Sequence, residues 1–228
     1  MYRFVILIVA FFSVIILRAQ HDTLMMVKYT PEFRFQDGVF LSFESVKKNS
    51  PIKPERIQTN LKKDDLKFYE KIFESEDFIY FDEYGVRQEV KVEGLWGYAS
   101  MGVLFIYYND ETNRMPIVGS MCHFVSNYTS QTQRNYDPFY NPYRVYDPYS
   151  YNYRTQPVTT REMRQYLLDW ETGKIFTYNR ESVAIILMKD PVLYEEFNAL
   201  KKSKQKKMVF FYMRRFNENN PIYIPNQF

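Results

Sequence analysis

The chain has 228 residues, with 30 basic and 27 acidic side chains and a formal net charge of +3 at pH 7. This weak positive charge excludes the strongly basic surface of nucleic-acid-binding proteins, so no nucleic-acid partner is expected. A single cysteine excludes an internal disulfide, and 21 tyrosines with 20 phenylalanines are too many aromatic residues for a disordered chain.

The N-terminus predicts a signal peptide. Arg3 precedes an almost uninterrupted apolar run at residues 4–17. A signal-peptide core has about 7–15 apolar residues, whereas a membrane-spanning helix needs about 20. Ala19 offers a small residue for cleavage, so we expect residues 1–19 to be removed on export; an uncleaved membrane anchor is the alternative. Without Arg3 and Arg18, 28 of the 30 basic residues stand against 27 acidic ones, a net charge of +1.

The segments that follow predict a hairpin and two helices. Residues 33–41 alternate around Asp37-Gly38, a dipeptide that favours a tight hairpin. Ser42 can cap a short helix over residues 43–48. Apolar residues recur at helical spacing in residues 61–73, which predicts a second helix.

A series of aromatic and β-branched segments then predicts an antiparallel meander. Gly, Asn and Asp residues separate these segments, as turns require. The expected strands are residues 77–82, 86–92, 94–98, 103–108 and 115–125.

Residues 126–160 are predicted to form a Tyr- and Pro-rich insertion. Pro138, Pro142 and Pro148 disfavour helix and central strand, so we expect an exposed connection between two strands. Its aromatic side chains suit contact with a glycan or a protein partner. The candidate binding residues are Tyr136, Phe139, Tyr140, Tyr143, Tyr146, Tyr149, Tyr151 and Tyr153. The alternative is that these rings fold back to cover the sheet.

The C-terminal third predicts a hairpin followed by helices. Residues 162–170 and 175–178 flank a turn. Asn179 and Asp190-Pro191 each predict a helix N-terminus. A third helix is predicted over residues 203–217, with a buried strand at 208–213 as the alternative.

We therefore expect residues 20–228 to form a single α+β domain that contains the insertion. Its core would be an antiparallel β-meander, with short N-terminal helices and a C-terminal helical segment.

Charge supplies a second candidate surface. Between residues 201 and 215 the chain has basic residues and no acid. The seven are Lys201, Lys202, Lys204, Lys206, Lys207, Arg214 and Arg215. Lys204, Lys206 and Lys207 are candidate contacts to an anionic membrane surface or glycan; a solvated helix face is the alternative. Residues 74–93 are acidic and could pair with the basic tract within the fold.

The sequence contains no recognisable catalytic or metal site. Cys122 and His123 are adjacent, and neighbours on a strand point to opposite faces, so they cannot form a dyad. One cysteine and two histidines are too few for a zinc site, and no cofactor motif is present. The acid pairs Asp82–Glu83 and Asp110–Glu111 lie in turn-like sequence, where acids are simply solvated.

Three regions carry a resemblance to a family of uncharacterised secreted bacterial proteins. They are residues 33–44 with Asn49-Ser50-Pro51, residues 95–98, and the segment that runs from Asp169-Trp170-Glu171-Thr172-Gly173-Lys174 to Asn219-Asn220-Pro221-Ile222-Tyr223. The resemblance implies a Gram-negative envelope location, either in the periplasm or associated with the outer membrane, and it implies no activity.

Together these observations predict a non-catalytic exported envelope module that binds a glycan, a peptide or an envelope protein. Two alternatives remain open. One is a cell-envelope hydrolase whose residues the sequence does not reveal, and the other is a structural subunit of an envelope complex.

Overall fold

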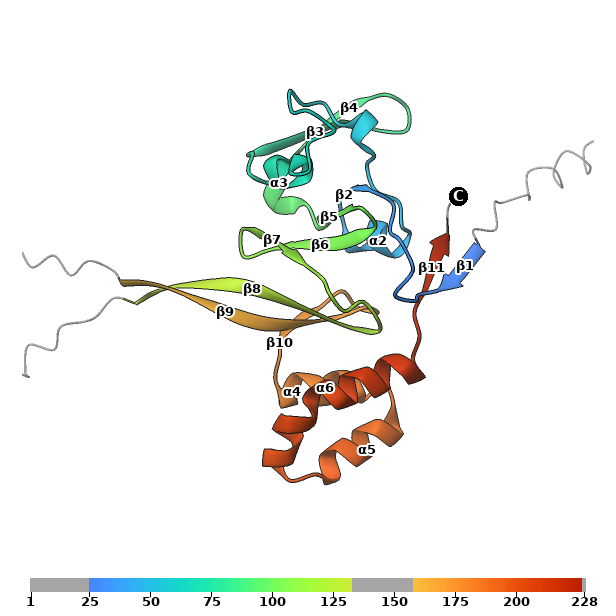
Figure 1. The fold of residues 1–228 in the computed structure, drawn as a ribbon, viewed down its shortest axis with the longest axis vertical. Helices are drawn as coiled ribbons and strands as arrows, with labels where there is room; N and C mark the ends of the chain where they lie inside the picture. Colours follow the sequence, from blue (N-terminus) through green and yellow to red (C-terminus); the bar gives the residue numbers. More distant parts are fainter. Residues whose placement is uncertain (1–24, 133–157, 227–228) are drawn as a thin grey trace, which may run out of the picture.

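The computed structural model describes residues 25–132 and 158–226 (Figure 1). Its N-terminal elements are β1 (Met25–Lys28), β2 (Gly38–Phe40), α2 (Phe43–Lys47), the 3-10 helix η1 (Pro54–Arg56), α3 (Phe68–Phe73), β3 (Asp77–Phe81), β4 (Arg87–Lys91), the 3-10 helix η2 (Val92–Gly94), β5 (Gly97–Ser100), β6 (Val103–Tyr108) and β7 (Glu111–Arg114). The remaining elements are β8 (Met121–Thr132), β9 (Val158–Asp169), β10 (Ile175–Thr177), α4 (Arg180–Leu187), α5 (Pro191–Ala199), α6 (Lys202–Asn219) and β11 (Tyr223–Asn226).

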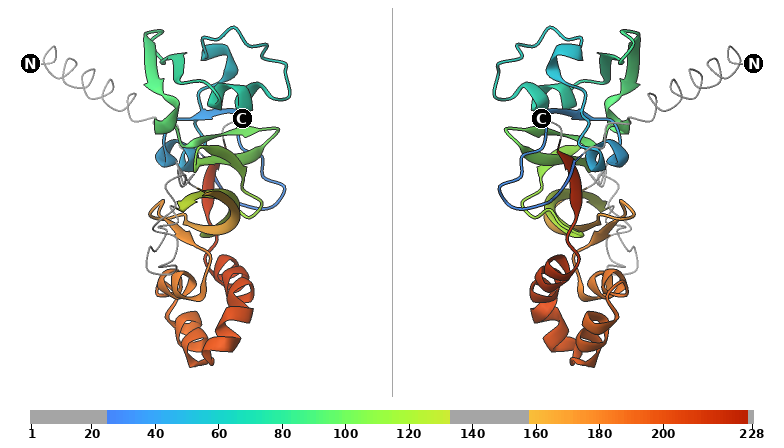
Figure 2. Two further views of the ribbon diagram at one scale, coloured as in Figure 1. Left: turned by 90° about the vertical axis from the view of Figure 1, so that its left-hand side faces the viewer. Right: turned by 90° about the vertical axis from the view of Figure 1, so that its right-hand side faces the viewer.

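The elements stack as layers along the long axis of the molecule (Figure 1). Helix α3 and the β3–β4 hairpin form one end, followed by the sheet β2-β5-β6-β7 and then by the sheet β10-β9-β8. Helices α4, α5 and α6 form the other end (Figure 2). A separate ribbon pairs β1 with β11. The antiparallel sheets and the C-terminal helices confirm the predicted α+β class.

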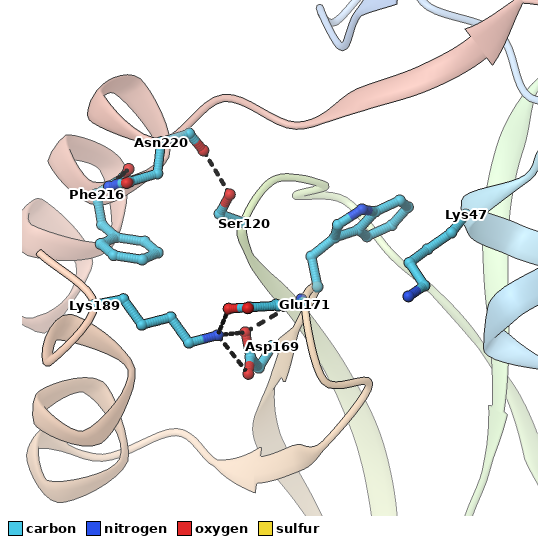
Figure 3. A pocket seen from close by; sticks show the side chains of 8 residues that line it. Lys47, Ser120, Asp169, Glu171, Lys189, Phe216 and Asn220 are labelled. Atoms are coloured by element: carbon cyan, nitrogen blue, oxygen red, sulfur yellow. Dashed lines mark hydrogen bonds and ion pairs between the residues drawn. The ribbon is translucent and has the colours of Figure 1, made fainter. Parts of the chain in front are cut away.

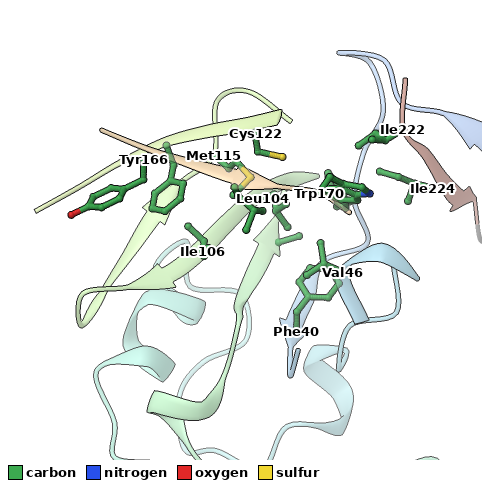
Figure 4. Close-up of a cluster of buried hydrophobic side chains, with 14 residues drawn as sticks. Phe40, Val46, Leu104, Ile106, Met115, Cys122, Tyr166, Trp170, Ile222 and Ile224 are labelled. Atoms are coloured by element: carbon green, nitrogen blue, oxygen red, sulfur yellow. The ribbon is translucent and has the colours of Figure 1, made fainter. Parts of the chain in front are cut away.

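Three hydrophobic cores lie between these layers. They form because successive side chains along a strand point to opposite faces of its sheet. In β6, Leu104 and Ile106 enter the core between the two sheets, while Phe105 faces the core beneath α3. In β9, Tyr166 enters the same central core (Figure 4), as does Leu168, whereas Leu167 packs against the C-terminal helices. Each inner strand therefore contributes to two cores, as the period of two in a strand requires.

Local signals in the sequence set three helix starts and two hairpins as predicted. Ser42 accepts a hydrogen bond from Ser45 N–H and begins α2. Asn179 caps α4, and Asp190 caps α5 with Pro191 in the first turn. The predicted hairpins β3–β4 and β9–β10 both form, and α6 is a helix rather than a strand.

The hairpin predicted at Asp37-Gly38 does not form. Gly38 instead begins β2, which pairs with the distant strand β5, and Gly38 has a φ of 150°. A Cβ atom at Gly38 would lie 2.5 Å from the carbonyl oxygen of Ile52, so only glycine fits this close approach. The carboxylate of Asp37 accepts from the N–H of Gly102 at 2.9 Å. Asp37-Gly38 therefore connects segments that are distant in the sequence and does not form a hairpin turn.

Three boundaries also differ from prediction. The helix expected over residues 61–73 is only α3, because Leu66 is exposed and does not join the buried stripe. The strand expected over residues 115–125 begins at Met121, after Pro116 has interrupted strand pairing. The insertion predicted at 126–160 is narrower, because β8 continues to Thr132 and β9 begins at Val158.

The acidic and basic segments lie at opposite ends of the molecule and do not pair (Figure 1). In the acidic segment, Lys91 bridges Glu76 and Asp77 at 2.8 and 2.9 Å. The predicted signal peptide lies outside the described residues. None of the helices within residues 25–132 and 158–226 combines the length and apolar character that crossing a bilayer requires.

Candidate functional site

A cavity of about 500 Å³ lies where the β9–β10 turn meets the ends of α4 and α6 (Figure 3). Its lining residues are Lys47, Ser120, Asp169, Trp170, Glu171, Lys189, Phe216 and Asn220. Lys189 enters from the C-terminal side of α4, and Lys47 reaches in from α2 on the opposite side (Figure 3). We call this cavity the turn pocket.

A buried carboxylate organises the floor of the turn pocket. The side chain of Asp169 is only 6% exposed, and Lys189 Nζ lies 2.7 and 2.9 Å from its two oxygens. The hydroxyl of Thr172 donates to Asp169 Oδ2 at 2.6 Å. The same Lys189 Nζ lies 2.7 Å from the more exposed carboxylate of Glu171. One ammonium group therefore pairs with both carboxylates and compensates the charge of the buried one, as a charge buried in protein requires.

The turn that holds these groups follows from its sequence. Asp169 N–H donates to the carbonyl of Lys174, and Gly173 N–H donates to the carbonyl of Asp169. Gly173 has a φ of 72°, the left-handed conformation that glycine adopts without strain. The sequence Asp-Trp-Glu-Thr-Gly-Lys thus places two carboxylates and an indole at one end of the β9–β10 hairpin.

Polar contacts fix the opposite wall of the turn pocket to α6. The hydroxyl of Ser120 donates to the carbonyl of Asn220, which is the C-cap of α6. One residue away, the side-chain amide of Asn217 bonds both backbone groups of Met121. This wall of the turn pocket therefore consists of elements that are joined to one another by hydrogen bonds.

Aromatic rings form the wall that faces α2. Phe43 packs edge-on against Trp170 with ring centroids 5.4 Å apart, and Phe43 also lies 5.8 Å from Trp96. Lys47 Nζ lies 5.5 Å from the centre of the Phe43 ring. These contacts hold the Trp170 indole in place beside the polar groups.

The two carboxylates of the turn pocket keep Lys189 ionised. Burial alone would lower the pKa of Lys189, but hydrogen bonds and charges from Asp169 and Glu171 outweigh it and raise that pKa. Lys189 is therefore a cation at neutral pH and is not a nucleophile or a general base.

The adjacent cysteine and histidine lie apart from this pocket and from each other. Cys122 is fully buried in the central core, where burial raises its thiol pKa to about 12. His123 points to the other face of β8, where its Nε2 lies 2.9 Å from Gln165 Oε1. The expected separation of the two side chains is confirmed, and the protonated thiol is unreactive at neutral pH.

In both acid pairs considered for glycan cleavage, one acid makes hydrogen bonds that support the fold. Asp82 Oδ1 accepts from Tyr84 N–H and Val86 N–H at 2.9 Å each, which shapes the β3–β4 turn and lowers the pKa of Asp82. Glu111 accepts from Arg161 and Asn127. Glu111 and Asp110 also line a shallow cavity of about 250 Å³ beside α3.

The structure separates the residues that the sequence singled out. Lys204, Lys206 and Lys207 are exposed on the first half of α6, outside the turn pocket. The aromatic candidates Tyr136, Phe139, Tyr140, Tyr143, Tyr146, Tyr149, Tyr151 and Tyr153 lie outside the described residues.

Sequence reasoning missed the turn pocket itself. The sequence predicts only a strand that ends at Trp170 and a turn at residues 171–174, although Asp169, Trp170 and Glu171 are adjacent in it. Lys189 and Ser120 reach the same place from distant parts of the chain, and no local spacing relates them to Asp169.

Comparison with known proteins adds no family to these observations. Among the described residues, no three His, Cys, Asp or Glu side chains converge as a metal site needs. Searches against protein-family models, curated proteins and solved structures found no match to this chain.

Proposed function

We propose that the chain is a non-catalytic exported module of a Gram-negative cell envelope, in the periplasm or associated with the outer membrane, that binds a glycan in the turn pocket. The observation that carries the proposal is the wall composition of the pocket. It combines the exposed carboxylate of Glu171 and the ammonium of Lys47 with the small accessible part of Trp170, a residue that is 7% exposed. Sugar hydroxyl groups can donate to such a carboxylate and accept from such an ammonium, beside a limited apolar contact.

The size and rigidity of the turn pocket also support this proposal. A volume of about 500 Å³ lies within the range of small-ligand sites, about 300–1,000 Å³. The hydrogen bonds of Asp169 to Lys189 and Thr172 orient the floor before any ligand arrives. Preorganisation of this kind lowers the entropy that binding costs.

The test is titration of the chain from Gln20 onward with soluble peptidoglycan fragments, followed by calorimetry. Glu171→Ala removes an exposed hydrogen-bonding group of the pocket and should weaken binding at least about tenfold. Glu181→Ala is the matched control, because Glu181 is an exposed acid that pairs with Arg180 away from the pocket. Its affinity should equal that of the wild type.

Two results would overturn the proposal. One is equal affinity of the wild type and Glu171→Ala, and the other is failure of the wild type to bind any of the glycan fragments. Mass spectrometry of the recovered fragments tests the hydrolase alternative, because cleavage products would replace a binding function with a catalytic one.

A further inference from the structure

The outer face of α6 combines exposed aromatic rings with lysines that form no ion pair with any described residue. The buried stripe of this helix consists of Gln205, Val209, Tyr212, Met213 and Phe216, which face α4, α5 and β8. Phe210 and Phe211 lie on the opposite side and are 47% and 46% exposed. Because they are adjacent in the chain and face away from the buried stripe, the two phenylalanines add apolar area to the exposed side of this helix.

Helical geometry places cations around both rings. Lys207 and Arg214 are seven residues apart, which is about two turns, so they share one line along the helix. Phe210 and Phe211 lie between them, one on each side of that line. Lys206 precedes Phe210 by four residues, so it lies next to that ring. We call the surface formed by these residues and Lys204 the cationic face of α6.

The lysines of this face have no acidic partner among the described residues. Within residues 25–132 and 158–226, no carboxylate lies within ion-pair distance of Lys204, Lys206 or Lys207. Further along α6, Arg214 lies 3.9 Å from Glu218 and Arg215 pairs with Glu196. The uncompensated charge is therefore concentrated beside the two rings, in the first half of the helix.

We infer that the cationic face of α6 binds the surface of a bilayer that contains anionic phospholipid. Aromatic rings are favourable at the boundary between headgroups and acyl chains, and lysines beside them can contact the phosphates. The face is the outer side of a single helix, so it can lie flat against a broad surface. Its positive charge is complementary to anionic lipid.

The distribution of charge over the whole molecule gives this contact an orientation. Helix α6 belongs to the helical end, whereas the acidic β3–β4 hairpin and α3 form the opposite end (Figures 1 and 2). An anionic surface attracts the first end and repels the second. This inference is independent of the turn pocket and adds a second binding surface to the proposed envelope module.

The experiment measures co-sedimentation of the chain from Gln20 onward with lipid vesicles. All described helices and strands lie downstream of this residue. Residues 4–17 are omitted because an apolar segment would bind vesicles by itself. The wild type should bind vesicles of phosphatidylcholine with phosphatidylglycerol and should bind pure phosphatidylcholine far less. Raising the ionic strength from about 0.1 M to about 1 M should reduce binding, because the Debye length falls from about 10 Å to about 3 Å.

Charge reversal tests the lysines. Each lysine near an anionic surface strengthens binding by about fivefold, so the triple variant Lys204→Glu, Lys206→Glu and Lys207→Glu should bind at least about a hundredfold more weakly. The control reverses three exposed lysines in another region, Lys62, Lys63 and Lys67, and changes the net charge equally. This control should lose much less affinity than the α6 variant.

Removal of the rings separates membrane insertion from simple charge attraction. The double variant Phe210→Ser and Phe211→Ser keeps all the cations but should weaken binding about tenfold. Leu66→Ser with Tyr84→Ser is the control, because these side chains are even more exposed, 81% and 90%. Circular dichroism of each variant should match that of the wild type, since none of the changed side chains is buried.

Each outcome of the vesicle experiments supports or overturns the inference. Selective wild-type binding to phosphatidylglycerol vesicles, lost in both α6 variants and kept in both controls, supports the inference. Equal binding to the two kinds of vesicle overturns it, as does an equal loss in the α6 and control charge variants. Glu171→Ala should bind vesicles like the wild type, so failure of glycan binding leaves this inference standing.

Discussion

The side-chain amide of Asn217 bonds both backbone groups of Met121. Asn217 Oδ1 accepts from Met121 N–H at 2.7 Å, and Asn217 Nδ2 donates to the Met121 carbonyl at 2.9 Å. Strand β8 is the edge of its sheet, so Met121 has no strand partner on this side. The amide therefore satisfies an open sheet edge and attaches α6 to the sheet in register.

This relationship predicts that Asn217→Ala is strongly destabilising. The substitution leaves the buried N–H and carbonyl of Met121 without partners, so the free energy of unfolding should fall by about 2–3 kcal/mol. Urea denaturation measures the change. Asn198→Ala is the control at an exposed position of α5, where the effect should stay within about 0.5 kcal/mol. Equal stability of the two variants would mean that the amide contacts contribute nothing.

A second prediction concerns the ion pair of Asp169 and Lys189. Lys189→Met leaves a buried carboxylate without its cation, which should cost about 2–3 kcal/mol of stability after allowance for the partial exposure of Lys189. Lys174→Met is the control, because Lys174 is exposed on the same turn.

The double variant Lys189→Met with Asp169→Asn tests the cause of that loss. No charge remains buried, and the asparagine can still accept from Thr172. Thermal or urea unfolding should therefore recover part of the stability that Lys189→Met loses. An additive loss in the double variant would contradict the assignment to an uncompensated charge.

The third prediction is a pH dependence at the start of α5. Hydrogen bonds from the side chain of Asn219 and from Leu193 N–H lower the pKa of Asp190. Because the folded pKa lies below the unfolded value of about 3.9, this stabilisation is complete above that pH and is lost as the pH falls through the folded pKa. Asp190→Asn retains a capping side chain but has no charge.

The measurement compares the free energy of unfolding of the wild type and Asp190→Asn from neutral pH to about pH 3. The wild type should be more stable at neutral pH, and the difference should shrink at the acidic end. Asp64→Asn, at an exposed position outside the cap of α5, is the control for the loss of one carboxylate. A difference for Asp190→Asn that grows toward low pH would contradict the prediction.

The parts of the fold that could be predicted from the sequence are those whose causes lie in neighbouring residues. Asn179 and Asp190 each bond an N–H three residues ahead, so both helix starts could be predicted from neighbouring residues. The partner of Gly38 is Ala99, and no neighbouring residue specifies it. A pattern that favours a hairpin therefore gave the wrong partner, because tertiary packing outweighed local turn propensity.

The same distinction between local and distant contacts explains which features of the candidate sites could be predicted from the sequence. The lysines of α6 lie close together in the chain, so they are visible in the sequence, but the exposure of Phe210 and Phe211 depends on which face the rest of the chain covers. The turn pocket depends on contacts between Asp169 and Lys189 and between Ser120 and Asn220. Ser120 and Asn220 are 100 residues apart, so only the folded chain reveals that they are neighbours.

The fourth prediction concerns export. Signal peptidase should cleave the chain near Ala19, because residues 4–17 match the length of a signal-peptide core, about 7–15 residues. Mass spectrometry or N-terminal sequencing of the protein from a Gram-negative host measures the mature end. A full-length product that retains Met1 in the inner membrane would make this segment an anchor instead.

The last prediction concerns the Tyr- and Pro-rich segment between β8 and β9. Replacement of residues 135–152 by a short Gly/Ser linker should leave the melting temperature nearly unchanged. The reason is that β8 and β9 pair up to Thr132 and Val158, so the hairpin register is specified by residues outside the replaced segment. The replacement also removes every aromatic candidate from Tyr136 to Tyr151, so recovery of envelope partners should fall.

A matched variant separates a general effect of the loop from an effect of its rings. Substituting Ser for Tyr136, Tyr140, Tyr143 and Tyr146 keeps the length and the prolines of the segment, and it should reduce partner recovery as the replacement does. A large loss of stability in either variant would place these rings in the core. Unchanged stability with unchanged partner recovery would remove this segment as a contact surface, leaving the turn pocket and the cationic face of α6 as the remaining proposed surfaces.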